Sequence, residues 1–243
     1  MNAPAAHPLL SAYVTSPYRY ENATDSAHDL TTLPDGRFDL IIFMQQQAVT
    51  QCRLYGLWTT ELSVQVPACT VVYGVGFKPL AAEILFGRSI APLLNAWQAI
   101  DPNSWQLEQL SGNSPADFGQ LLIAQCLSRI QFSPPPDSRK LALFNLLEQS
   151  AGSLAVQEIA DRVNWSSRQL NRYMNHQLGL SLKAYTSILR CQAAYADIRK
   201  GVLFPQQPFF DQSHFIRDIK RITGATPGQL RQNKDDRFLQ FRP

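Results

Sequence analysis

The sequence predicts an α+β protein with two domains: a small antiparallel, barrel-like β domain that ends in helices, followed by an all-α domain. Three observations predict this division. Runs of β-branched and aromatic residues alternate with turn formers between about residues 13 and 76. Helical periodicity takes over from residue 79. A proline-rich stretch, SPPPDS, then separates two helical regions. We therefore expect domains at 1–132 and 139–243, joined by a linker at 133–138.

Length and composition limit the classes of protein that fit this chain. Its 243 residues are 45% hydrophobic and 17% charged, enough for one large or two modest domains with cores of their own. No apolar run approaches the ~18 residues that cross a bilayer, and the N-terminus lacks the pattern of a secretion signal. We expect a cytoplasmic protein with no membrane partner. The cysteines lack CxxC spacing, which favours buried free thiols over disulfides or a zinc site: Cys52, Cys69, Cys126 and Cys191.

The charge is distributed unevenly between the two domains. Residues 1–138 hold six Lys and Arg against eleven Asp and Glu, whereas residues 139–243 hold sixteen against eight. The first part therefore has a net charge of −5 and the second a net charge of +8. This asymmetry indicates an acidic module joined to one that binds polyanions.

The N-terminal domain begins with short predicted strands, FDLIIF (38–43), ELSVQV (61–66) and CTVVYGVGF (69–77), separated by turns such as LPDG (33–36). From 79 to 132 the pattern predicts helices, in LAAEILFG, APLLNAWQAI and ADFGQLLIAQCLSRIQF. The last of these has one largely apolar face, which packs either in the chain's own core or against a second copy. That face consists of Phe118, Leu121, Leu122, Gln125, Cys126 and Arg129.

Catalytic and metal-binding patterns are scarce in this domain. Its histidines, His7 and His28, lie far apart, and the chain contains no GxSxG, P-loop or GxGxxG motif. Asp35 and Asp39 are suited to acid/base work, but Asp35 precedes Gly36 in a turn that explains it structurally. We therefore expect no catalytic residue, no metal and no cofactor, and we disfavour an enzyme with its active site in the β domain.

The C-terminal domain has the pattern of a helix-turn-helix. After a helix at 139–151, apolar spacing predicts a short helix at 153–163, and Asn164 allows a tight turn. Ser166 and Gln169 then form the spacing of a capping box. The inner face of the next helix is Leu170, Tyr173, Met174 and Leu178, and its outer face is Arg168, Asn171, Arg172 and Asn175. Arg and Asn are the side chains that read guanine and adenine in the major groove, although ordinary solvated positions would look the same.

Two further helices are predicted. Ser181 caps a long connecting helix that ends before Gly201, with an apolar stripe of Tyr185, Ile188 and Leu189. Asp211 caps another helix, whose inner face is Phe215, Ile219 and Ile222. Its exposed start carries a second set of polar side chains: Gln212, Ser213, His214 and Arg217.

The segment from about 153 to 230 resembles the DNA-binding domain of AraC/XylS-type transcriptional regulators, which has two helix-turn-helix units on a shared long helix. The resemblance is carried by EIADRVNWSSRQLNRYMNHQLGLSLKAY and by FFDQSHFIRDIKRITGATPGQL. More weakly, TLPDGRFDLIIF and GVGFKPLAAEILFG resemble the small β-rich sensor-like domain that precedes it in one branch of the family. The resemblance implies a sequence-specific regulator that binds double-stranded DNA. It also implies an N-terminal domain that binds a small-molecule effector or forms a homodimer.

Carried over by position, the base-facing residues of the family fall on Arg168, Asn171 and Arg172 in the first unit. In the second unit they fall on Gln212, Ser213, His214 and Arg217, where His214 could equally pack beside Phe215. We expect phosphate contacts, which position the protein without reading sequence, from Ser167, Lys183, Lys220 and Arg221.

The sequence departs from the family before the second recognition helix. Family members place a helix of about three turns there, whereas this chain has VLFPQQP (202–208), and two prolines in seven residues cannot form it. We therefore predict a truncated second unit in which Val202, Leu203, Phe204 and Phe209 fill the space as an apolar plug. The alternative function is a sensing or partner-binding protein that has lost specific DNA reading.

Overall fold

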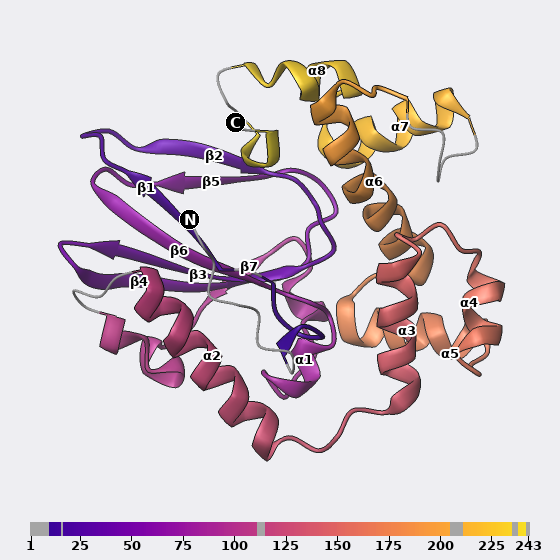
Figure 1. Cartoon of the computed structure of the whole chain (residues 1–243), viewed down its shortest axis with the longest axis horizontal. Helices are drawn as coiled ribbons and strands as arrows, with labels where there is room; N and C mark the ends of the chain where they lie inside the picture. Colours follow the sequence, from indigo (N-terminus) through magenta and orange to yellow (C-terminus); the bar gives the residue numbers. More distant parts are fainter. Residues whose placement is uncertain (1–9, 16, 111–114, 205–210, 235–237, 242–243) are drawn as a thin grey trace.

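The computed structural model confirms the α+β architecture, with strands in the N-terminal half and helices in the C-terminal half (Figure 1). It describes residues 10–15, 17–110, 115–204, 211–234 and 238–241. The strands are β1 (Tyr18–Asn22), β2 (His28–Thr32), β3 (Phe38–Gln45), β4 (Ala48–Tyr55), β5 (Leu62–Val66), β6 (Thr70–Phe77) and β7 (Trp97–Ala99). The helices are α1 (Ala81–Ile84), α2 (Pro115–Phe132), α3 (Ser138–Gln149), α4 (Val156–Arg162), α5 (Ser167–Leu178), α6 (Leu182–Lys200), α7 (Gln212–Thr223) and α8 (Pro227–Gln232).

Two antiparallel sheets form the N-terminal domain. Five strands pair in the order β1-β6-β3-β4-β7, and β2 pairs with β5. Strand β3 shows why the layers pack as they do, because its side chains alternate between two faces. Leu40 and Ile42 join the core that the helices cover, whereas Ile41 and Phe43 pack toward the β2–β5 sheet. The same alternation places Asp39 on the side of the second sheet.

One of the predicted helices is replaced by a strand. The segment APLLNAWQAI contains a single 3₁₀ turn, η2 (Ala91–Leu93), followed by β7, which extends the sheet beside β4. A helix cannot continue through this segment because Asn95 has a φ of 55°, in the left-handed region. Beyond it, the ring of Trp97 lies 4.3 Å from the Arg53 guanidinium of β4. Strand β7 is thereby held on the sheet.

Helix α2 packs into the chain's own core. Phe118, Leu122 and Cys126 are buried there, which confirms the intramolecular alternative for this face, and Arg129 lies over the Trp105 ring at 4.1 Å. Burial raises the pKa of the Cys52, Cys126 and Cys191 thiols to about 12. Cys69 is exposed, so the prediction of a buried thiol is wrong at that position. Among the described residues, no helix is both long and apolar enough to span a membrane.

Helix α6 is the axis of the C-terminal half (Figure 1). Helices α3 and α5 pack on it, as do α7 and α8 of the second unit. The predicted caps are present: Ser181 accepts a hydrogen bond from the Ala184 amide at 3.2 Å, and Gly201 ends the helix with a φ of 94°. After Gly201, Val202 and Phe204 are 48% and 49% exposed, so the predicted plug is wrong for these two residues. Leu203 does pack against the core, and Phe209 lies outside the described residues.

The two halves meet where the turn at 33–37 docks on α6. Tyr195 donates a hydrogen bond to the Pro34 carbonyl at 3.0 Å, and Tyr185 donates one to the Gly36 carbonyl at 3.1 Å. Leu33 belongs to the same buried cluster as Ile188 and Phe215, so the turn is part of the core beneath the second unit. Buried backbone carbonyls need such partners, and these two bonds fix the N-terminal domain on the long helix.

We predict that Gly36→Ala weakens this docking. Gly36 has a φ of 77°, and a Cβ there would lie 3.0 Å from Leu189 Cδ2 and 3.2 Å from the Tyr185 ring. Gly87 is a matched control because it has a φ of 62° and nothing within 4 Å of the added Cβ. Both substitutions should cost about 1 kcal/mol through backbone strain. Gly36→Ala should lose about 1–2 kcal/mol more through overpacking, measured by urea unfolding of the full chain. Equal losses for the two variants would show that the turn does not bear on α6.

Candidate nucleic-acid interface

Helices α4 and α5 form a helix-turn-helix with the predicted local chemistry. Asn164 makes the turn with a φ of 54°. The capping box is complete: Ser166 Oγ accepts from the Gln169 amide at 3.2 Å, and Gln169 Oε1 accepts from the Ser166 amide at 2.9 Å. Helix α4 is shorter than predicted, beginning at Val156. The inner face of α5 is anchored by Leu170, Met174 and Leu178, none of which exposes any surface.

The first half of α5 presents its polar side chains outward. Arg168 and Arg172 are exposed, and Lys183 is exposed at the start of α6. Asn171 is half-buried and engaged within the chain: its Nδ2 donates to the Ser167 carbonyl at 3.0 Å, and its Oδ1 accepts from the Leu182 amide at 3.1 Å. Its base-facing role stays a prediction, but the side chain already joins α5 to α6. The Ser167 hydroxyl, expected to contact phosphate, lies 3.3 Å from Gln157 Oε1 of α4.

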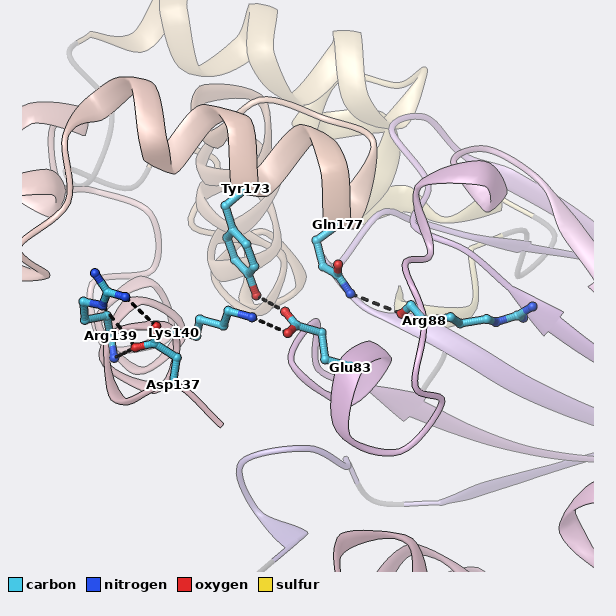
Figure 2. A network of polar contacts seen from close by, with 7 residues as sticks. All are labelled: Glu83, Arg88, Asp137, Arg139, Lys140, Tyr173 and Gln177. Carbon is cyan, nitrogen blue, oxygen red and sulfur yellow. Dashed lines mark hydrogen bonds and ion pairs between the residues drawn. The ribbon is translucent and has the colours of Figure 1, made fainter. Parts of the chain in front are cut away.

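The second half of α5 is held by the N-terminal domain (Figure 2). The Tyr173 hydroxyl donates to Glu83 of α1 at 2.5 Å, and Lys140 of α3 forms an ion pair with the same carboxylate. Burial, followed by the hydrogen bond to Glu83, raises the pKa of Tyr173 well above its ordinary value, so the hydroxyl stays a donor. We call Glu83, Lys140 and Tyr173 the latch.

Backbone groups extend this contact to the end of α5. Gln177 Nε2 donates to the Arg88 carbonyl at 3.1 Å, and the Ile90 amide donates to the Gln177 carbonyl at 3.0 Å. The Ser89 hydroxyl donates to the His176 carbonyl at 2.7 Å. The bonds from Ile90 and Ser89 satisfy the carbonyls of Gln177 and His176, two of the last carbonyls that a helix leaves without partners. The N-terminal domain thus supplies part of the C-terminal cap of α5.

Helix α7 is built in the same way as α5. Asp211 caps it by accepting from the His214 amide at 2.8 Å, as predicted. Phe215, Ile219 and Ile222 are buried against α6 and α8. Gln212, Ser213 and Arg217 are exposed at its start, and Lys220 and Arg221 are exposed further along. His214 is half-buried, with its Nε2 3.7 Å from Asp218 Oδ2 on the next turn.

The arrangement is suited to polyanion binding. Both α5 and α7 expose basic and amide side chains toward their N-terminal ends, where the helix dipole also favours anions. Within the described part of the chain, no group of three or more His, Cys, Asp and Glu side chains could hold a metal ion. Sequence reasoning placed the exposed residues of α5 and α7 but missed the latch. Nothing local marks Glu83, which lies 57 residues from Lys140 and 90 from Tyr173.

Solved structures that resemble this one include ToxT from Vibrio cholerae in several forms. ToxT bound to an unsaturated fatty acid is 9% identical with a TM-score of 0.49, over 94% of this chain and 96% of that one. ToxT from the O395 strain is 10% identical with a TM-score of 0.46, over 88% and 95%. ToxT bound to (E)-4-(8-methylnaphthalen-1-yl)but-3-enoic acid is 13% identical with a TM-score of 0.42, over 89% and 95%. No match was found among the curated proteins.

Two family models match separate parts of the chain. Residues 3–98, which include the sheet strands β1–β6 and most of β7, match a domain of unknown function (DUF6597). Residues 159–233, from within α4 to the end of α8, match a helix-turn-helix domain. The motifs IADRVNW (159–165) and TGATP (223–227) fall inside this second match. The chain therefore carries a helix-turn-helix domain of the AraC type, preceded by an N-terminal domain of a separate family.

Proposed function

We propose that the chain is a sequence-specific DNA-binding transcriptional regulator whose reading of DNA is controlled by a ligand through the N-terminal domain. The observation that carries the proposal is the shared construction of α5 and α7. Each is capped at its start, buried along one face against the same helix α6, and exposed at the positions that would meet base edges. Two such helices on one rigid axis would enter successive major-groove faces about 34 Å apart.

The bases would be read mainly by Arg168 and Arg172 on α5 and by Gln212, Ser213 and Arg217 on α7. A guanidinium can donate two hydrogen bonds to guanine, and an amide can pair with adenine. Asn171 contributes less in this proposal because both ends of its amide already have partners. Lys183, Lys220 and Arg221 would contact phosphates.

Control by the N-terminal domain follows from its hold on α5 and α6. The latch restrains α5 of the first unit, and the docked turn at 33–37 restrains α6, on which both units pack. A ligand that moves either contact would change how α5 and α7 are aligned for DNA, because coupling requires differential contacts in two states. Pairing of two copies of the chain stays a prediction.

A second candidate is a sensing or partner-binding protein that no longer reads a DNA sequence. It is favoured by the sequence before α7: VLFPQQP (202–208) has two prolines in seven residues, which argue against a helix that could support the second unit. Selection of bound fragments from random duplexes by the purified chain separates the two functions. An enriched motif supports the regulator, and an unenriched pool supports the second candidate.

We predict that Arg168→Ala reduces both affinity and base preference. Removing a bidentate donor should cost about 1–3 kcal/mol and relax selection at one base position. Arg217→Ala should do the same at a position about one helical turn away if α7 also reads bases. The measurement is gel-shift affinity and footprinting on a selected site.

The control is Arg19→Ala in β1, which removes the same charge from the N-terminal domain and should leave base preference unchanged. A loss of affinity for Arg168→Ala that is uniform over all sequences would assign Arg168 to phosphate binding. A loss of discrimination confined to Arg168→Ala would show that α7 adds charge without reading bases.

Binding should also weaken steeply with salt, because each neutralised phosphate releases counterions. We predict that Lys220→Ala lowers the slope of log affinity against log salt by about 1 and leaves base preference intact. Titrations at several salt concentrations measure this slope. A wild-type affinity that does not change with salt would contradict DNA binding altogether.

We predict that Glu83 and Tyr173 are energetically coupled. A double-mutant cycle with Glu83→Ala and Tyr173→Phe in urea unfolding should give a coupling of about 1–3 kcal/mol, because a charge-assisted hydrogen bond is broken in a half-buried site. Glu158 and Arg162 form an exposed pair within α4 and serve as the control. Their coupling should be below about 0.5 kcal/mol. Equal couplings for the two pairs would show that the latch does not hold α5.

A further inference from the structure

A cavity of about 200 Å³ lies between the five-stranded sheet and the β2–β5 pair. Its walls are aromatic and aliphatic, with Tyr18 and Tyr55 from the large sheet, Leu30 and Val66 from the pair, and Trp58 from the loop between β4 and β5. For scale, an apolar cavity of roughly 150 Å³ holds one benzene ring. This cavity therefore has room for one aromatic ring with a short side chain.

One end of the cavity is acidic. Asp35 and Arg37 reach it from the docked turn, and Asp39 reaches it from β3. Asp35 is partly paired, since it accepts from the Arg37 amide at 3.0 Å and lies 3.8 Å from Arg37 Nε. The Asp39 carboxylate makes no hydrogen bond or ion pair within the described residues. Two carboxylates thus face one guanidinium.

The lining contains one polar group, the Asp39 carboxyl, that a cationic ligand would pair, whereas an ammonium has no acceptor and would leave the Trp58 N–H as it is. Burial, and then the Asp35 carboxylate, raise the pKa of Asp39 well above its ordinary value, while Arg37 opposes this effect. The titratable groups around Asp39 are Tyr18, Tyr20, Tyr55, Asp35 and Arg37. In addition, the indole Nε1 of Trp58 is buried without a hydrogen-bond partner among the described residues. Buried polar groups are rarely left in this state.

The cavity is closed by the C-terminal tail, whose short helix η6 (Leu239–Phe241) lies beside β2 (Figure 1). Leu239 and Gln240 line the cavity. Gln240 Nε2 donates to Thr32 Oγ1 at 2.9 Å and to the Leu33 carbonyl at 3.1 Å, and its Oε1 accepts from the Leu33 amide at 3.2 Å. Phe241 belongs to the same core as Phe215 of α7. The tail therefore touches both the cavity and the second unit.

We propose that this cavity binds a small organic cation, an arylalkyl amine, with its ring between the aromatic walls and its ammonium group at Asp39 and Asp35. The aromatic faces add cation–π attraction, and a half-buried carboxylate pairs best with a charged donor. Binding of the amine in the cavity changes the contacts of the tail and of the turn at 33–37, and these contacts transmit the change to α6 and α7. This reporting step rests on the proposed function, whereas binding of the amine does not.

Calorimetry on the full chain tests the ligand class with three probes of one shape: 2-phenylethylamine, 2-phenylethanol and phenylacetate. The amine should bind at least about tenfold more tightly than the alcohol or the acid. Asp39→Asn keeps the shape of the side chain and should remove this preference. Asp29→Asn, on the exposed face of β2, should keep it. Gln240→Ala should weaken amine binding by opening the closed side.

The pH dependence gives an independent readout. Burial raises the pKa of Asp39 in the empty site, and an ammonium group beside it would favour the ionised carboxylate, so amine binding should be linked to release of a proton. Affinity for the amine should therefore rise with pH as Asp39 ionises, over the range in which the ligand amine itself stays charged. Affinity for the alcohol should stay constant. Equal binding of the alcohol or acid, an amine preference that survives Asp39→Asn, or no binding of any probe up to millimolar concentrations each overturns the proposal.

The reporting step is tested separately on a selected DNA site. The amine should change DNA affinity by at least about fivefold, the lower end of typical allosteric coupling. Tyr195→Phe removes the hydroxyl that holds Pro34 and does not line the cavity, so it should reduce this change while the amine still binds. Amine binding without any DNA site contradicts the proposed function alone. DNA binding that the amine does not alter contradicts the reporting step.

Discussion

The structure depends on the docking of the turn at 33–37 against α6. Tyr185 and Tyr195 lie on one face of that helix and donate to two carbonyls of the turn, and Leu33 beside them enters the core of the second helix-turn-helix unit. A carbonyl left unpaired in such a place costs about 1–3 kcal/mol, so the two hydroxyls fix one relative position of the domains. The latch contacts the first unit, the tail contacts β2, and α5 and α7 keep Arg168, Arg172, Gln212 and Arg217 exposed.

The contacts between the two halves leave the two ends of α5 in different surroundings. The first half of α5 exposes Arg168 and Arg172 to solvent, while the last carbonyls of its second half accept from the Ser89 hydroxyl and the Ile90 amide of the N-terminal domain. Asn171 lies between these parts and joins α5 to the first residue of α6. A helix that is held along its inner face, its end and its side has little freedom to adjust alone. A movement of the N-terminal domain would therefore carry the unit as a body, through its junctions with α1 and with the docked turn.

How much the sequence could predict depends on whether a signal is local. Strands β3 and β6 are buried on both faces and read as apolar runs, whereas β1, β2, β4 and β7 carry more polar residues and were missed. The caps at Ser166, Ser181 and Asp211 use neighbouring residues, so they were predicted correctly. Asn95 set a backbone angle that apolar spacing does not encode, and a helix was expected where β7 lies. Asp35 was assigned to turn geometry, which its bond to the Arg37 amide confirms, but its place in a cavity with Asp39 arises from strand pairing and tertiary packing. The latch joins three distant segments, and no periodicity could have indicated it.

The β-bridge between Thr31 and Phe238 joins segments that are synthesised at very different times. Gln240 bonds to Leu33 across 207 positions of the chain, so β2 leaves the ribosome long before the segment that covers it. At roughly 5–20 residues per second, that interval is about 10–40 s. Throughout that interval, the contacts that residues 238–241 make with β2 and with the cavity cannot form. Whatever folds earlier, this side of the cavity can be covered only after that segment has been synthesised.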